Sequence, residues 1–163
     1  FINAAECCIK NFDLDITFLS IGSGRLLDQN IKYNNSKGLQ NNLYFLGHKS
    51  NVESYIKNSD LIVLTSNNGE GLSNVIMESM ALKKAVIATE CPGTKELLTN
   101  NKTGILVKKK DFNAIAEKIK TLYSSESTKK IIGGRAFIAL EKKFSVNSMI
   151  ENFCAIIKKI QNS

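Results

Sequence analysis

The chain has 163 residues and a formal net charge of +7, and 43% of its residues are hydrophobic. This length suits one domain with a real core, and no apolar run approaches the roughly 18 residues of a membrane span. The four cysteines are not in Cys-x-x-Cys pairs and lack metal-ligand spacing. The composition therefore argues against a membrane-spanning protein or a cysteine metal site, and it favours reduced thiols in a cytoplasm.

The positive charge arises from 22 Lys and Arg residues against 15 Asp and Glu residues. Such an excess could serve binding to nucleic acid or to an anionic membrane surface. The lysines are spread along predicted helices, and no aromatic residues alternate with their one cluster, at 108–110. A base-stacking surface for nucleic acid is therefore poorly supported, and a solvated lysine-rich exterior is the simpler interpretation.

Predicted strands and helices alternate along most of the chain. The apolar patterns predict helices at 1–10, 26–40, 52–58, 74–82, 94–98 and 112–123, and strands at 13–21, 43–46, 60–66, 85–89 and 105–107. This alternation is typical of a parallel sheet with helices on both faces, a Rossmann-like α/β fold. We expect a single domain over 1–163, with the core in 1–124 and two further helices in 125–163.

Two of the later helices have clear apolar faces. Asp111 is a good N-cap for the helix at 112–123, whose expected inner face is Phe112, Ile115, Ile119 and Leu122. The last helix, 146–160, carries a stripe of Met149, Phe153, Ile156, Ile157 and Ile160. A stripe at this spacing usually packs into a core, and contact with another domain is the alternative.

Glycines follow three of the predicted strands, at Gly22, Gly47 and Gly69. The carboxyl ends of parallel strands meet at one edge of a sheet, where ligands of such folds bind. Gly22 and Gly24 form a Gly-x-Gly turn, which is half of a dinucleotide-binding fingerprint, but Leu27 stands at the third glycine position. The turn therefore has a steric explanation as well as a functional one.

The chain is organised around residues 69–82, Gly-Glu-Gly-Leu-Ser-Asn-Val-Ile-Met-Glu-Ser-Met-Ala-Leu. A buried strand leads into this stretch, and Ser73 is a good N-cap for the helix that follows. The start of that helix directs backbone N–H groups and the positive end of its dipole at whatever lies above the sheet, which suits a phosphate. Glu70 precedes the helix, and Glu78 lies about one turn inside it, ~6 Å along the axis. Carboxylates at these positions could bind sugar hydroxyls.

The pair of Glu70 and Glu78, placed after a strand that ends in Ser66, resembles the signature of a large enzyme family. That family is the retaining glycosyltransferases of the glycogen-synthase and sucrose-synthase type, the GT4-like part of glycosyltransferase group 1, with the GT-B fold. The flanking segments match in order: 43–47, 52–55 and 60–66 before the motif, and 80–89, 92–98 and 103–107 after it. The resemblance runs over about 1–123. It implies the C-terminal, donor-binding domain of a GT-B enzyme.

The resemblance implies roles for residues around the helix start. A glutamate at the position of Glu78 holds the ribose of the nucleotide in that family. The N–H groups of Leu72, Ser73 and Asn74, which follow Gly71, would take the diphosphate. These roles agree with the argument from the helix dipole.

The resemblance also implies a catalytic role for Glu70, which would bind hydroxyls of the donor sugar and place its anomeric carbon for transfer. Further donor-site residues are expected at earlier strand ends, although plain core packing explains the apolar ones equally well. These residues are Gly22, Gly24, Phe45, Leu46 and Val52.

The implied reaction moves a sugar from a nucleotide-sugar to a glycan or lipid-linked acceptor with retention of configuration. UDP-sugars are the commonest donors in the family, and no metal or other cofactor is expected. Asp13 and Asp15 form an Asp-x-Asp pattern, but at the amino end of a strand. The cysteine pattern favours a cytoplasmic location, and the lysine-rich surface leaves room for contact with an anionic membrane at its inner face.

The chain also departs from the family pattern. The family supplies an Arg and a Lys to the diphosphate from a strand and loop ahead of the first helix, and this chain starts in that helix. We therefore expect that strand, which lies mid-sheet in the family, and the acceptor domain to be missing here. Alone, the chain should have little or no transferase activity.

Two other classes of protein remain open. One is a sugar-nucleotide epimerase with a GT-B-like fold, which shares the sheet and the nucleotide site. The other is a non-enzymatic α/β module that binds nucleotide or nucleic acid. A receiver domain would need acidic residues where this rim has Gly, Ser and Asn, and a P-loop NTPase would need Gly-x4-Gly-Lys-Ser/Thr, which does not occur.

Overall fold

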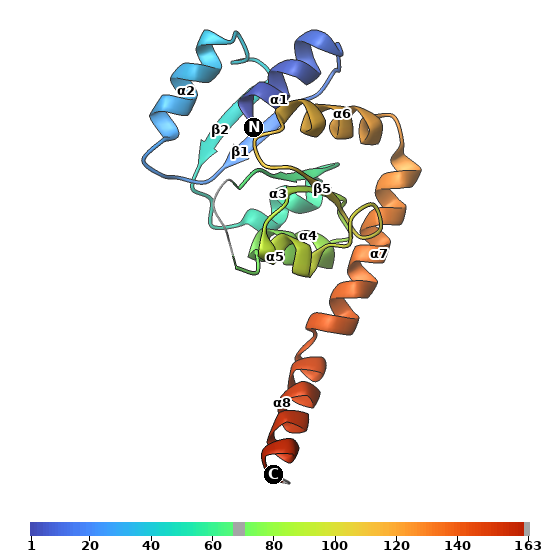
Figure 1. Cartoon of the computed structure of the whole chain (residues 1–163). Coiled ribbons are helices and arrows are strands. Elements are labelled where there is room, and N and C mark those ends of the chain that lie inside the picture. The colour runs from blue at the N-terminus through green and yellow to red at the C-terminus, as the bar shows by residue number, and fades with distance from the viewer. Residues whose placement is uncertain (67–70, 162–163) are drawn as a thin grey trace.

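The computed structural model describes residues 1–66 and 71–161 (Figure 1). Helices and strands alternate as expected, which confirms the α/β class. The strands are β1 (Phe18–Ile21), β2 (Leu43–Gly47), β3 (Ile62–Leu64), β4 (Val86–Thr89) and β5 (Ile105–Val107). The helices are α1 (Ile2–Glu6), a π-helical turn η1 (Cys7–Asn11), α2 (Leu27–Ser36), α3 (Val52–Asn58), α4 (Asn74–Ala81), α5 (Pro92–Leu97), α6 (Phe112–Tyr123), α7 (Glu126–Phe144) and α8 (Val146–Gln161).

The described strands form two parallel sheets instead of one. β1 pairs with β2, while β3, β4 and β5 pair in that order. The first strand is also shorter than the predicted 13–21, since it begins at Phe18, and Asp13 has a left-handed φ of 50° that a strand does not accommodate. The break between the two sheets lies on the β1 and β3 sides.

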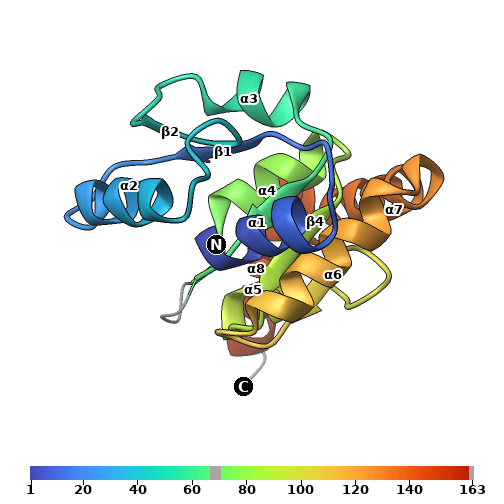
Figure 2. The same cartoon turned by 90° about the horizontal axis from the view of Figure 1, so that it is seen from above.

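Helices cover both faces of β4, the most buried strand (Figure 2). Ile87 packs in a core with α1, η1 and α6, whereas Val86 and Ala88 pack in a second core with α4, α5 and α7. Successive side chains of a strand point to opposite faces, so a strand covered on both sides is apolar throughout. All four residues of β4 are accordingly buried.

The helices α6 and α7 complete the domain, and α8 extends away from it (Figure 1). Ile115, Ile119 and Leu122 of α6 are buried as predicted, but Phe112 is 40% exposed, because the first residue of the helix lies beyond the edge of the core. No helix within the described residues combines the length and the apolar character needed to cross a bilayer.

The apolar stripe of α8 does not join the core, so the simpler interpretation of that stripe is wrong. None of the residues of α8 is buried. The five side chains of the stripe, from Met149 to Ile160, are 39–71% exposed. The helix follows Ser145, whose extended backbone ends α7 and points α8 away from both cores.

Candidate functional site

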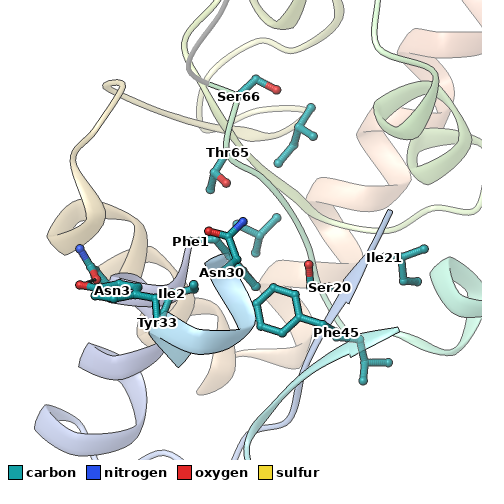
Figure 3. A pocket seen from close by; sticks show the side chains of 13 residues that line it. Phe1, Ile2, Asn3, Ser20, Ile21, Asn30, Tyr33, Phe45, Thr65 and Ser66 are labelled. Atoms are coloured by element: carbon teal, nitrogen blue, oxygen red, sulfur yellow. Dashed lines mark hydrogen bonds between the residues drawn. The ribbon is translucent and has the colours of Figure 1, made fainter. Parts of the chain in front are cut away.

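A cleft of about 490 Å³ opens between β1 and β3 (Figure 3). Apolar strand residues form its floor, and hydroxyl and amide groups lie along its walls. The lining residues come from α1, β1, α2, β2 and the end of β3: Phe1, Ile2, Asn3, Leu19, Ser20, Ile21, Asn30, Tyr33, Phe45, Val63, Leu64, Thr65 and Ser66. The volume is typical of a small-molecule pocket.

Two side-chain contacts tie α1 to α2 and to Lys37, the C-cap of α2; Asn3 and Tyr33 line the cleft, and Glu6 and Lys37 are not among its lining residues. The hydroxyl of Tyr33 donates to Asn3 Oδ1 at 2.9 Å, and Lys37 Nζ lies 2.9 Å from a carboxylate oxygen of Glu6. The hydrogen bond from Lys37 lowers the pKa of Glu6, and the same contact raises the pKa of Lys37.

Glycine turns end β1 and β2 and are tied to each other. The N–H of Gly22 donates to the carbonyl of Gly47 at 2.9 Å. Gly22 has a φ of 137° and Gly47 a φ of 68°, conformations in which a side chain would be strained. These two turns therefore meet at one rim, as predicted, while Gly69 lies outside the described residues. Gly24, the second glycine of the first turn, is exposed and accepts a hydrogen bond from the N–H of Leu27.

A buried hydrogen-bond network holds the carboxyl end of β3 against β4. Thr89 Oγ1 donates to the carbonyl of Ser66 at 2.7 Å. The hydroxyl of Thr94 donates to the carbonyl of Thr89 at 2.9 Å and accepts from the N–H of Cys91 at 2.8 Å. This network fixes the backbone immediately before residues 67–70. The sequence did not predict this network. The one feature that could have indicated it is Thr89, a hydroxyl residue at the end of an otherwise apolar strand.

Helix α4 begins after Ser73, at the position predicted from the sequence. Ser73 is 7% exposed, and its side chain makes no capping hydrogen bond to the helix. Three other helices, α3, α6 and α7, do close their first turn with an N-cap side chain, from Asn51, Asp111 and Ser125. The first N–H groups of a helix lack intrahelical acceptors. Those of α4 therefore have no acceptor from their N-cap side chain and suit an external anion.

The other predicted site residues on this stretch are less buried than Ser73. Gly71 and Leu72 precede α4 on the surface, and a Cβ placed on Gly71 would meet open space. Asn74 is exposed at the first position of the helix, and Glu78 is exposed one turn further on. Glu70, the predicted catalytic residue, lies outside the described residues.

The three apolar residues predicted for the donor site do not all line the cleft. Phe45, the middle residue of β2, is half-buried and lines the cleft (Figure 3). Leu46 and Val52 are half-buried but are not among the residues that line it. Ser66 is the last residue in the chain that lines the cleft, and α4 begins shortly after it, at Asn74. Within 1–66 and 71–161, no three His, Cys, Asp or Glu side chains gather into a group that could hold a metal ion.

Comparison with known proteins identifies the family. Residues 1–125 match the family described as Glycosyl transferases group 1. The chain is 38% identical over 104 residues to the capsular polysaccharide biosynthesis glycosyltransferase CapM of Staphylococcus aureus, an alignment that covers 64% of this chain and 27% of CapM. The chain therefore belongs to the group 1 glycosyl transferases, the family that its motif resembles.

Solved structures share this fold. A mutant of S. aureus TarM, crystallised in complex with Fondaparinux, alpha-GlcNAc-glycerol and UDP, superposes with a TM-score of 0.86 at 25% identity, covering 94% of this chain and 31% of TarM. The C-terminal domain of the group 1 protein LpcC from Francisella tularensis gives a TM-score of 0.78 at 28% identity, covering 90% of this chain and 78% of that domain. The chain thus spans less than a third of the length of CapM and TarM.

Proposed function

We propose that this chain is the donor-binding half of a glycosyltransferase that uses a nucleotide-sugar, with UDP as the nucleotide. The observation that carries the proposal is the start of α4, where a buried Ser73 leaves the first turn without a side-chain cap at the carboxyl edge of the β3 sheet. Family membership and the UDP named in the TarM complex support the choice of ligand.

In this proposal, the diphosphate accepts hydrogen bonds from the N–H groups of Leu72, Ser73 and Asn74. The positive end of the α4 dipole adds to that attraction. Glu78, one turn into the same helix, receives the ribose hydroxyls on its carboxylate, which accepts hydrogen bonds only. One rigid element thereby fixes both the phosphate and the sugar of the nucleotide.

The chemical step in this proposal is transfer with retention of configuration to a glycan or lipid-linked acceptor. Glu70 positions the donor sugar, and backbone dipoles stabilise the charge of the departing diphosphate without a metal ion. The acceptor site, and the cations that complete the diphosphate site, come from the remainder of the protein. The reaction takes place in the cytoplasm, where the lysine-rich surface allows contact with an anionic membrane.

Calorimetric or NMR titration of the chain with UDP, GDP and ADP tests the site directly. We expect UDP to bind with a Kd on the order of 0.1–1 mM, or roughly −4 to −5.5 kcal/mol. Glu78→Ala should abolish detectable binding, because the ribose loses its acceptor. Glu141→Ala, an exposed carboxylate on α7, is the matched control and should leave the Kd unchanged.

Binding that is equal for all three nucleotides, or insensitive to Glu78→Ala, would contradict the assigned roles. The reaction itself is tested on the full-length protein with UDP-sugars in the presence of EDTA. NMR of the product anomer distinguishes retention from inversion, and product analysis distinguishes transfer from epimerisation. A full-length protein that transfers no sugar from any donor would overturn the proposal.

A further inference from the structure

The lysines of this protein differ in how the structure holds them. Some lie in ion pairs with glutamates: Lys10, Lys37, Lys95, Lys129 and Lys130. Others lie 4.2 to 4.9 Å from the centre of an aromatic ring: Lys83, Lys120 and Lys143. Lys108, Lys109 and Lys110 are consecutive and exposed, and no ion pair or ring contact between described residues includes them.

These three lysines follow β5, at the same edge of the sheet as the proposed donor site. The N–H of Glu90, after β4, donates to the carbonyl of Val107 at 2.8 Å, and Thr89 Oγ1 donates to the carbonyl of Ser66 at 2.7 Å. The carboxyl ends of the parallel strands β3, β4 and β5 are thereby tied side by side. Because neighbouring strands lie about 4.8 Å apart, the lysines begin roughly 10 Å from the strand end that precedes residues 67–70.

A hollow of about 340 Å³ is lined by residues 108–113. The lining combines three ammonium groups with an aromatic ring, since Phe112, the first residue of α6, is 40% exposed. Its one carboxylate belongs to Asp111, which accepts a hydrogen bond from the N–H of Ala114 at 2.9 Å as the N-cap of α6. Three lysines against one aspartate leave the hollow with a formal charge of +2.

The backbone at the end of the lysine cluster has an unusual conformation. Lys110 has a left-handed φ of 64°, which glycine adopts freely and lysine only against its own Cβ. A lysine where glycine suits the backbone better points to a role for its charge outside folding.

Ammonium groups beside an exposed ring match the chemistry of an anionic phospholipid surface. Lysine binds phosphate as a compact point charge, and each lysine near an anionic bilayer adds to the attraction within a Debye length. An exposed Phe can enter the boundary between headgroups and acyl chains. Nucleic acid fits this loop less well, because single strands stack their bases on successive aromatic rings and the loop has one.

We propose that residues 108–113 dock this protein on an anionic phospholipid bilayer, with the three lysines on lipid phosphates and Phe112 in the acyl boundary. This inference rests on the proposed function, because it assigns the membrane contact of that enzyme to one surface. Docking through this loop turns the carboxyl edge of the β3 sheet, and with it the start of α4, towards the bilayer. A lipid-linked acceptor is anchored in the same bilayer, so the donor sugar and the acceptor meet there.

Co-sedimentation of the full-length protein with phosphatidylcholine vesicles, with and without phosphatidylglycerol, tests the proposal. We expect binding only with phosphatidylglycerol, and weaker binding as salt is raised to ~0.5 M. K108Q/K109Q/K110Q should weaken binding on the order of 100-fold, since each lysine contributes roughly fivefold. The matched control, K32Q/K57Q/K102Q, removes the same charge from exposed lysines on α2, on α3 and before β5. It should weaken binding by less than about threefold.

The ring is tested separately by Phe112→Ala. This variant should bind the same vesicles roughly tenfold more weakly than the parent, and that ratio should not change with salt, because insertion of an apolar ring is not screened. The thermal midpoint of each variant shows that the protein remains folded.

A fluorophore attached to a single cysteine identifies the face that meets the bilayer. Asn113→Cys places it in the hollow and Lys102→Cys places it before β5, both in a Cys154→Ser background because Cys154 is the exposed native thiol. Vesicles with phosphatidylglycerol should shift the emission at 113 to the blue and protect it from aqueous iodide, while the label at 102 should remain accessible.

Equal binding of the lysine variant and its control would overturn the proposal, as would a label at 113 that stays accessible in the bound protein. Loss of binding on removal of α8, with the lysine variant unaffected, would assign the contact to α8 instead. Binding to an oligonucleotide but not to vesicles would assign the loop to nucleic acid.

Titration with UDP separates this inference from the proposed function. The lysine variant should lose the vesicles and keep the parental Kd for UDP. A parent protein that docks through the loop but binds no UDP would contradict the proposed function and leave the docking surface in place.

Discussion

Gly133 of α7 lies directly against the backbone carbonyl of Lys83, just beyond α4, so that a Cβ on Gly133 would overlap that carbonyl. The absence of a side chain is what allows the two helices to come so close. Lys83 adds a second contact, since its Nζ lies 4.7 Å from the centre of the Phe137 ring. The adjacent Gly134 has open space around the same position.

Gly133→Ala should therefore destabilise the protein and Gly134→Ala should not. We expect a loss of about 1–3 kcal/mol in the free energy of unfolding for Gly133→Ala, because backbone must move to admit the methyl group. Gly134→Ala should gain up to about 1 kcal/mol from helix propensity. Urea denaturation of both variants measures the difference, and equal effects would contradict the close approach of α7 to Lys83.

The hydroxyl of Thr89 should contribute measurably to stability through the carbonyl of Ser66. Thr89→Val keeps the shape of the side chain but leaves that carbonyl with one donor fewer, which should cost about 1–2 kcal/mol. Thr89→Ser keeps the hydroxyl and should retain the hydrogen bond. Chemical denaturation with amide exchange at residues 64–66 measures both. If Thr89→Val were as stable as the wild type, the network would not hold this strand end.

The four cysteines should differ sharply in reactivity. Cys7, Cys8 and Cys91 are buried, and Cys154 on α8 is exposed. Burial, with smaller effects from Cys7 and Glu117, raises the pKa of the Cys8 thiol to about 12. A raised pKa keeps the thiol neutral, so at pH 8 only ~1 in 10⁴ of Cys8 is the reactive thiolate.

Ellman's reagent should therefore label one thiol per native chain quickly and all four after denaturation. Cys154→Ser should remove the fast label. Two or more fast labels in the native protein would show that one of the buried cysteines is accessible.

Removal of α8 should have little effect on the stability of the domain. None of its residues is buried, so a chain ending at Ser145 loses little apolar burial. We expect the free energy of unfolding to change by less than about 1 kcal/mol. Binding of the dye ANS should fall because the stripe from Met149 to Ile160 is gone.

The control for this truncation is Ile132→Ala on α7, whose side chain is 5% exposed and lies in the core. This variant should lose about 2–4 kcal/mol. A truncated chain that is destabilised as strongly as Ile132→Ala would show that α8 packs on the domain.

Local patterns in the sequence predicted most of the secondary structure. Ser73 as the start of α4 and Asp111 as the cap of α6 depend on a few neighbouring residues, which sequence alone displays. The family resemblance likewise depends on residues close together in the chain, and the match over 1–125 confirmed that the chain belongs to the group 1 glycosyl transferases. The role of Glu70 stays a prediction.

The tertiary structure decided what depends on distant residues. Apolar periodicity is the same for a helix that packs and for one that does not, so the exposure of α8 was not predictable from its stripe. The bond between Thr89 and Ser66 and the fit of Gly133 against Lys83 join segments far apart in the chain. The division of the sheet at β1 and β3 has the same origin, because strand pairing is a long-range contact that no local pattern encodes.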